Sequence, residues 1–156
     1  MAHEQHDNAG VIAPPPLIFV GSLAVGLLLQ RLYPVKILPR VPGLILGSIC
    51  FSVAGVLLPG AFREMQRAKT NIDPYEPVTT IVTEGPFRYT RNPIYLALAL
   101  LSAGIAFIAN AFWVLLLLPF VLLLINFGVI EREERYLENK FGKQYLDYKA
   151  RVRRWV

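Results

Sequence analysis

The chain has 156 residues, of which 54% are hydrophobic and 17% are charged, and its mean hydropathy is +0.45. This length fits one domain, and the apolar composition excludes an intrinsically disordered chain. The formal net charge is +5, but the positive residues flank long uncharged runs, so the basic balance does not indicate nucleic-acid binding.

Three runs contain no Asp, Glu, Lys or Arg: 23 residues over 8–30, 22 residues over 41–62 and 39 residues over 92–130. A membrane-spanning helix needs about 20 consecutive apolar residues. The sequence therefore predicts an all-α integral membrane protein, with residues 1–156 forming a single membrane domain.

Residues 1–16 are predicted to be a flexible N-terminus, and a first span is predicted at 17–33. The span is placed after Pro14, Pro15 and Pro16, because proline is not tolerated inside a regular helix. The span is not expected to be a cleaved signal peptide, since no basic residue precedes it and no clear small-residue cleavage site follows. A second span is predicted at 43–62.

The third uncharged run is too long for one crossing. As a helix, its 39 residues would reach about 58 Å at about 1.5 Å per residue, against a hydrocarbon core of about 30 Å. Two spans at 93–109 and 111–130, joined as a tight hairpin, fit better. Asn110 is the best turn residue between them.

Four spans place both ends of the chain on one side of the membrane. That side would hold thirteen of the sixteen Lys and Arg residues, and the other side only Arg31, Lys36 and Arg40. By the positive-inside rule, both termini are predicted to be cytoplasmic. The 63–92 loop and the 131–156 tail then share one aqueous face of a multi-pass protein, in a bacterial inner membrane or an endoplasmic-reticulum-like membrane.

The tail carries an apolar stripe at spacings of 4, 3, 4 and 3, formed by Phe141, Tyr145, Tyr148, Val152 and Trp155. This spacing predicts one amphipathic cytoplasmic helix. A basic helix with an aromatic face suits the headgroup layer. Trp155 and the last arginines are therefore expected to anchor the chain on membrane lipids.

Two carboxylates follow the fourth span in an unusual place. Glu133 and Glu134 lie three and four residues after Ile130, on the face that stays apolar further along the helix. Carboxylates on a packed face are costly without a partner. Two interpretations stay open: a functional pair, or a salt bridge to Arg88 or Arg91.

The segment 85–95 has more polar and aromatic groups than a helix start needs. Asn92 is predicted to cap the third span, with Pro93 in its first turn. Capping does not explain the additional side chains of Arg88, Tyr89, Arg91 and Tyr95. Cations and aromatic faces beside a carboxylate indicate a cleft for an amphoteric ligand of nucleoside size.

The order and spacing of these motifs resemble the isoprenylcysteine carboxyl methyltransferase family. These membrane-embedded enzymes use S-adenosyl-L-methionine and are related to phospholipid methyltransferases. The resemblance covers about residues 70–156 and rests on Thr80-Ile81-Val82, Gly85-Pro86-Phe87, Arg91-Asn92-Pro93-Ile94-Tyr95, Glu133-Glu134 and the tail from Phe141-Gly142 to Arg151-Val152.

The resemblance implies a pocket for S-adenosyl-L-methionine between the loop and the tail. The expected cofactor-binding residues are Thr80, Ile81, Val82, Phe87, Tyr89, Asn92, Pro93, Ile94, Tyr95, Glu133 and Glu134. Catalytic roles are assigned to Arg91 and to Glu134, the latter as general base if the acceptor is a thiol or an amine. No metal site is predicted.

The expected function is transfer of a methyl group to a lipid-like or prenylated small-molecule acceptor, with a carboxylate acceptor implied by the resemblance. Eukaryotic-type members carry an arginine before the acidic pair, whereas residues 126–129 here contain no cation. Two alternatives stay open: a non-catalytic module that binds anionic lipid or a partner through its basic tail, and an NADPH-dependent, sterol-reductase-like enzyme. The sequence does not define the acceptor or the oligomeric state.

Overall fold

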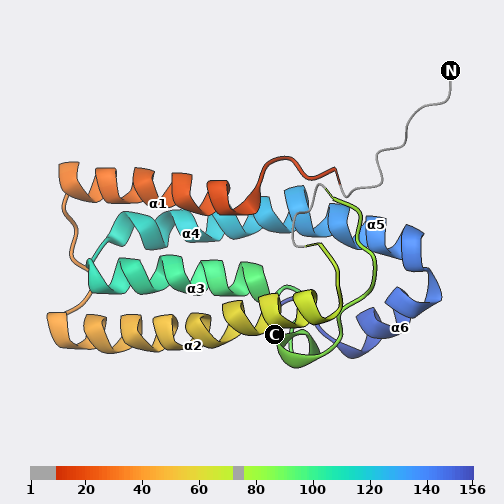
Figure 1. Ribbon diagram of the computed structural model, residues 1–156. Helices are drawn as coiled ribbons and strands as arrows, with labels where there is room; N and C mark the ends of the chain where they lie inside the picture. The colour runs from red at the N-terminus through yellow and green to blue at the C-terminus, as the bar shows by residue number, and fades with distance from the viewer. Residues whose placement is uncertain (1–9, 72–75) are drawn as a thin grey trace, which may run out of the picture.

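The computed structural model describes residues 10–71 and 76–156, and within these ranges the chain is helical and has no strand (Figure 1). The other residues, 1–9 in the predicted N-terminal segment and 72–75 in the predicted loop, lie outside the described part. The long helices are α1 (Pro15–Leu32), α2 (Arg40–Arg67), α3 (Pro93–Ile108) and α4 (Phe112–Ile125). A π-helical turn, η2 (Asn126–Ile130), joins α4 to α5 (Glu131–Phe141), and α6 (Lys143–Arg151) follows.

The four long helices lie side by side, with α1 on α4, α4 on α3, and α3 on α2. The turn between α3 and α4 is at Asn110, whose φ is +52°, which confirms the predicted turn residue. Its Oδ1 accepts hydrogen bonds from the backbone of Ile37 and Leu38, and its Nδ2 donates to the carbonyl of Leu38. Asn110 therefore also holds the loop between α1 and α2.

Small residues let the α2 and α3 backbones approach closely. A Cβ added at Gly47 would overlap Cγ1 of Ile108 and would lie 2.9 Å from the carbonyl oxygen of Gly104. Close approach at glycine is how helices associate where no hydrophobic driving force is available, as in a bilayer.

The predicted start of the first helix is wrong by two residues. The helix begins at Pro15, with proline in its first turn. The amide hydrogens of that turn have no intrahelical partner, so proline there costs no hydrogen bond. The second helix extends to Arg67, five residues beyond the predicted end of the span at residue 62.

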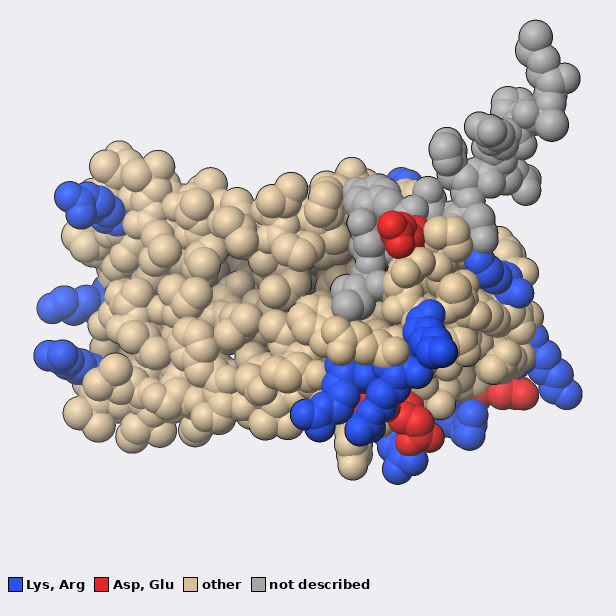
Figure 2. All heavy atoms as spheres, in the orientation of Figure 1, with Lys and Arg blue, Asp and Glu red and all other residues tan. Residues whose placement is uncertain are grey.

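Three helical segments are long and apolar enough to cross a membrane: Pro15–Leu32, Arg40–Arg67 and Phe112–Phe141. Helix α3 is apolar but has only 16 residues. It would span about 24 Å at about 1.5 Å per residue, so the count of four spans stays a prediction. Figure 2 shows Lys and Arg side chains at both ends of the molecule, with an uncharged band between them. Most of these side chains gather at the end formed by α5 and α6.

The single helix predicted for the tail is wrong. Gly142 has φ +53° and separates α5 from α6, and the chain becomes extended at Val152. Tyr145 and Tyr148 are buried within the protein, and Trp155 packs against the apolar core formed by α1, α3 and α4. The apolar stripe thus covers the protein's own surface, which the spacing alone cannot distinguish from a lipid-facing stripe.

Candidate functional site

A cavity lies at the charged end of the bundle, between the loop that precedes α3, the first turn of α3, and helices α5 and α6. Its empty space, including the part open to solvent, is ≈ 940 Å³. The predicted site residues that line it are Thr80, Ile81, Val82, Phe87, Arg91, Asn92, Pro93, Ile94, Tyr95, Glu133 and Glu134.

Tyr89 is the predicted site residue that the structure leaves outside this lining. It follows the short helix η1 (Gly85–Arg88) and is 76% exposed. Other lining residues were missed as site residues, and they are Met65, Thr70, Asn71, Val78, Ile130, Tyr136, Leu137, Tyr145 and Tyr148. A signal existed for Tyr145 and Tyr148, because both belong to the apolar stripe of the tail.

The end of the chain holds the segment that leads into α3. The backbone N–H of Arg91 donates to the carbonyl of Arg153 at 3.0 Å. The side chains of Thr90 and Asn92 both donate to the carbonyl of Arg154, at 3.1 and 2.9 Å. Asn92 occupies the predicted cap position, but its side chain makes no cap hydrogen bond. The predicted capping is therefore wrong, and the buried amide of Asn92 binds the tail instead.

Glu133 and Tyr95 form a hydrogen-bonded pair in the cavity, in which the Tyr95 hydroxyl donates to Oε1 of Glu133 at 2.6 Å. Glu133 lies three residues after Ile130, the last residue of the uncharged run, and thus outside the predicted span 111–130. Burial raises the pKa of Glu133 to about 7. The hydrogen bond from Tyr95 lowers this pKa, and the neighbouring charge of Glu134 raises it, so burial dominates.

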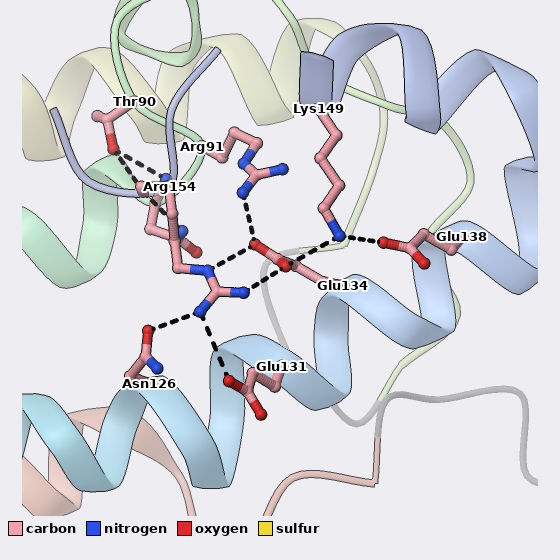
Figure 3. A network of polar contacts seen from close by, with 9 residues as sticks. Thr90, Arg91, Asn126, Glu131, Glu134, Glu138, Lys149 and Arg154 are labelled. Atoms are coloured by element: carbon pink, nitrogen blue, oxygen red, sulfur yellow. Dashed lines mark hydrogen bonds and ion pairs between the residues drawn. The ribbon is translucent and has the colours of Figure 1, made fainter. Parts of the chain in front are cut away.

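Glu134 is the centre of a cluster of ion pairs (Figure 3). Its carboxylate lies 2.9 Å from Nη2 of Arg91 and 3.5 Å from Nζ of Lys149. Arg154 donates to it through Nε at 3.0 Å and Nη2 at 2.8 Å. Burial alone would raise the pKa of Glu134, but the hydrogen bond from Arg154 and the three positive charges outweigh it, so the net pKa is lowered.

The salt-bridge interpretation is thus confirmed for Glu134 and Arg91. Arg88 instead pairs with Glu84 on the surface. A carboxylate whose pKa is lowered is a weak proton acceptor. The general-base role of Glu134 stays a prediction, although its environment favours an ion-pairing role.

The π-helical turn η2 comes directly before the acidic pair. Such a turn accommodates one more residue than an α-helical turn, so it rotates the following residues around the helix axis. Both Glu133 and Glu134 line the cavity after this turn. Within the described residues, no group of three or more His, Cys, Asp or Glu side chains is arranged to hold a metal ion.

Comparison with known proteins gave two matches. A family model described as phospholipid methyltransferase matches residues 42–144, which include segment 91–95 and both glutamates. An uncharacterized protein of Haemophilus influenzae is 44% identical over 64 residues, which is 40% of this chain and 100% of that protein. No solved structure matches at a significant level.

Proposed function

Because the chain belongs to the phospholipid methyltransferase family, we propose that it is an integral-membrane methyltransferase that uses S-adenosyl-L-methionine to methylate a hydrophobic or lipid-like acceptor. The observation that carries this proposal is the cavity at the charged end of the apolar helices, with the Tyr95–Glu133 pair in its wall. At this position we expect the cavity to be reached by a water-soluble donor and by a lipid-like acceptor.

The residues of the cavity fit the proposed donor chemically. Glu133 can accept hydrogen bonds from ribose hydroxyls or an amino group. Ile81, Val82 and Phe87 offer an apolar wall, and the ring of Tyr145 lies in the lining, where an aromatic face can stabilise a cation. When bound, S-adenosyl-L-methionine supplies a methyl group already activated on a sulfonium.

The chain's own contribution is therefore positioning and exclusion of water. A carboxylate acceptor is ionised at neutral pH and needs no general base. A thiol or amine acceptor would need one, and the carboxylate of Glu133, with its pKa near 7, is better suited to accept that proton than Glu134.

The proposed topology has four spans, with α3 as the short one, and both termini in the cytoplasm. The gathering of Lys and Arg at the α5–α6 end supports this orientation. The acceptor would enter from the lipid between the helices. A carboxylate acceptor follows from the resemblance, and an isoprenylcysteine is one candidate among lipid-like carboxylates.

Calorimetry in detergent with S-adenosylhomocysteine tests donor binding. The wild type is expected to bind, and Glu133→Gln to weaken binding by about 10- to 100-fold, since hydrogen bonds to a charged group are lost. Glu138→Gln is the matched control, because Glu138 lies on the same helix and outside the cavity lining. Wild-type protein that binds no S-adenosylhomocysteine would contradict the proposal.

Two further measurements separate the alternatives. Thermal stabilisation by S-adenosylhomocysteine but not by NADPH favours the methyltransferase over a reductase. Incubation with labelled S-adenosyl-L-methionine and a native lipid extract then identifies the acceptor by the lipid that becomes labelled. A non-catalytic membrane module would label none.

A further inference from the structure

Arg91 has donors that the protein does not use. Its side chain is 8% exposed and lines the cavity. Nη2 pairs with Glu134, but Nε and Nη1 are buried and have no hydrogen-bond partner among the described residues. Nearly all buried polar groups in proteins are paired, because an unpaired donor costs its full desolvation. Unpaired guanidinium donors on a side chain that lines a cavity indicate that a ligand supplies the acceptor.

The charge balance around Arg91 leads to the same conclusion. Figure 3 shows Arg91, Arg154 and Lys149 approaching Glu134 from different sides. The single negative charge of Glu134 is thus shared by three cations.

Two of these cations have a second carboxylate nearby. Lys149 pairs with Glu138, and Arg154 lies 3.6 Å from Glu131. Both of these side chains are also more exposed than Arg91. Arg91 therefore keeps the least compensated charge of the three, in the most buried position.

The other carboxylate of the cavity does not supply this compensation. Oε1 of Glu133 accepts the hydrogen bond from Tyr95, and no ion pair joins Glu133 to Arg91 within the part of the chain that the structure describes. Burial raises the pKa of Glu133 to about 7, so near neutral pH this group carries only part of a negative charge.

We propose that Arg91 binds a carboxylate of the ligand through the guanidinium N–H groups that Glu134 leaves unused. This inference rests on the proposed methyltransferase function. A planar guanidinium is well matched to a planar carboxylate, and such charge-assisted hydrogen bonds are among the strongest in proteins. The carboxylate has two possible sources: the amino-acid end of the methyl donor, or the head group of a lipid acceptor.

Two pairs of ligands distinguish these sources. In each pair, one ligand carries a carboxylate and the other does not. For the donor, calorimetry compares S-adenosylhomocysteine with its decarboxylated analogue, S-adenosyl-3-thiopropylamine. For the acceptor, thermal stabilisation compares oleate with oleyl alcohol in the same detergent. The carboxylate member of the relevant pair should bind wild-type protein about 10- to 100-fold more tightly.

Arg91→Gln should abolish that preference, so that the two members of the relevant pair bind the variant with similar affinity. Arg88→Gln is the matched control, because Arg88 lies three residues away on the surface and outside the cavity lining. Arg91→Lys keeps a cation near Glu134 and provides a second variant if Arg91→Gln does not fold. It should keep part of the preference.

A preference lost in Arg91→Gln and kept in Arg88→Gln supports the proposal, and the affected pair identifies the source. If wild-type protein binds S-adenosylhomocysteine but Arg91→Gln changes the preference in neither pair, the proposed role of Arg91 is wrong and the proposed function still stands. Wild-type protein that binds neither nucleoside ligand overturns the proposed function, and this inference with it.

Discussion

Replacing Glu134 by glutamine tests whether the ion-pair cluster holds the loop, α5 and the tail together. Glu134→Gln keeps the shape of the side chain and removes its charge. The carboxylate is only 6% exposed, and the facing Arg91 would be left buried opposite a neutral amide. Removing one partner of a buried ion pair typically costs about 3–5 kcal/mol.

The lower part of this range is expected, because the other two cations have alternatives. Arg154 and Lys149 are partly exposed and also contact Glu131 and Glu138. We therefore expect the free energy of unfolding to fall by about 3 kcal/mol. For a chain of this size, about 1 kcal/mol shifts the melting temperature by about 2–4 °C, so Tm should fall by about 6–12 °C.

The assay is thermal unfolding in detergent, with Glu138→Gln as control. Glu138 is 30% exposed and pairs with Lys149, and such partly exposed pairs contribute about 1 kcal/mol or less. If the two variants melt within about 2 °C of each other, Glu134 does not hold these elements together, and the reasoning fails.

The pH dependence of Glu134→Gln follows from the lowered pKa of Glu134. A carboxylate with a folded-state pKa below its unfolded value contributes its full stability above the unfolded value, 4.5 here. That contribution is lost as the pH falls through the folded-state pKa. The difference in Tm between wild type and variant should therefore be smaller at about pH 3.5 than at pH 7, and an unchanged difference would argue against ion pairing.

Two further predictions concern the cavity and the helix packing. Because the pKa of Glu133 is about 7, its ionised fraction rises about tenfold from pH 6 to pH 8. Affinity for S-adenosylhomocysteine should rise by up to about tenfold over that interval, and calorimetry showing the same profile in Glu133→Gln would exclude this residue as the cause. Gly47→Ala should lower the free energy of unfolding by about 1–3 kcal/mol, because the new methyl group meets α3. Gly55→Ala is the control, since nothing lies within 4 Å of its added Cβ, and equal melting temperatures for the two variants would refute close packing at Gly47.

The helices and the α3–α4 turn could be predicted because their signals are local. Uncharged runs of known length determine where apolar helices fit, and Asn110 tolerates the positive φ that the turn requires. The start at Pro15 was missed for a local reason as well, since proline is excluded from a helix interior but not from its first turn.

The tail could not be predicted in the same way, because its conformation depends on contacts distant in sequence. The carbonyls of Arg153 and Arg154 accept hydrogen bonds from residues 90–92, more than 60 positions earlier. No periodicity in the tail contains this information. The stripe correctly placed Tyr145 and Tyr148 on one face of a helix, but it was assigned to the headgroup layer, whereas both side chains are buried within the protein.

For the site, the sequence predicted which residues meet and included the Glu134–Arg91 ion pair among its alternatives, but it did not identify the other partners. The spacing after Ile130 placed Glu133 and Glu134 on one face, and both line the cavity. Their partners come from other elements: Tyr95 from α3 for Glu133, and Arg154 from the end of the chain for Glu134. Side-chain pairs of this kind depend on tertiary packing, which the sequence pattern does not contain. For the same reason, Tyr89 was predicted as a site residue but is exposed and lies outside the cavity lining.

The opposite environments of the two neighbouring glutamates give the basic tail a role in the chemistry of the cavity. Arg154 is the strongest cause that lowers the pKa of Glu134, and the charge of ionised Glu134 in turn raises the pKa of Glu133. The tail therefore keeps Glu134 charged at neutral pH, whereas burial is the main cause that raises the pKa of Glu133 to about 7. The backbone carbonyl of Arg154 also accepts hydrogen bonds from Thr90 and Asn92. One tail residue therefore contacts both the ionised carboxylate of the cavity and the loop that leads into α3. The positive charge of Arg154 thus lowers the pKa of a carboxylate in the cavity wall. Anchoring on lipid would not require this contact.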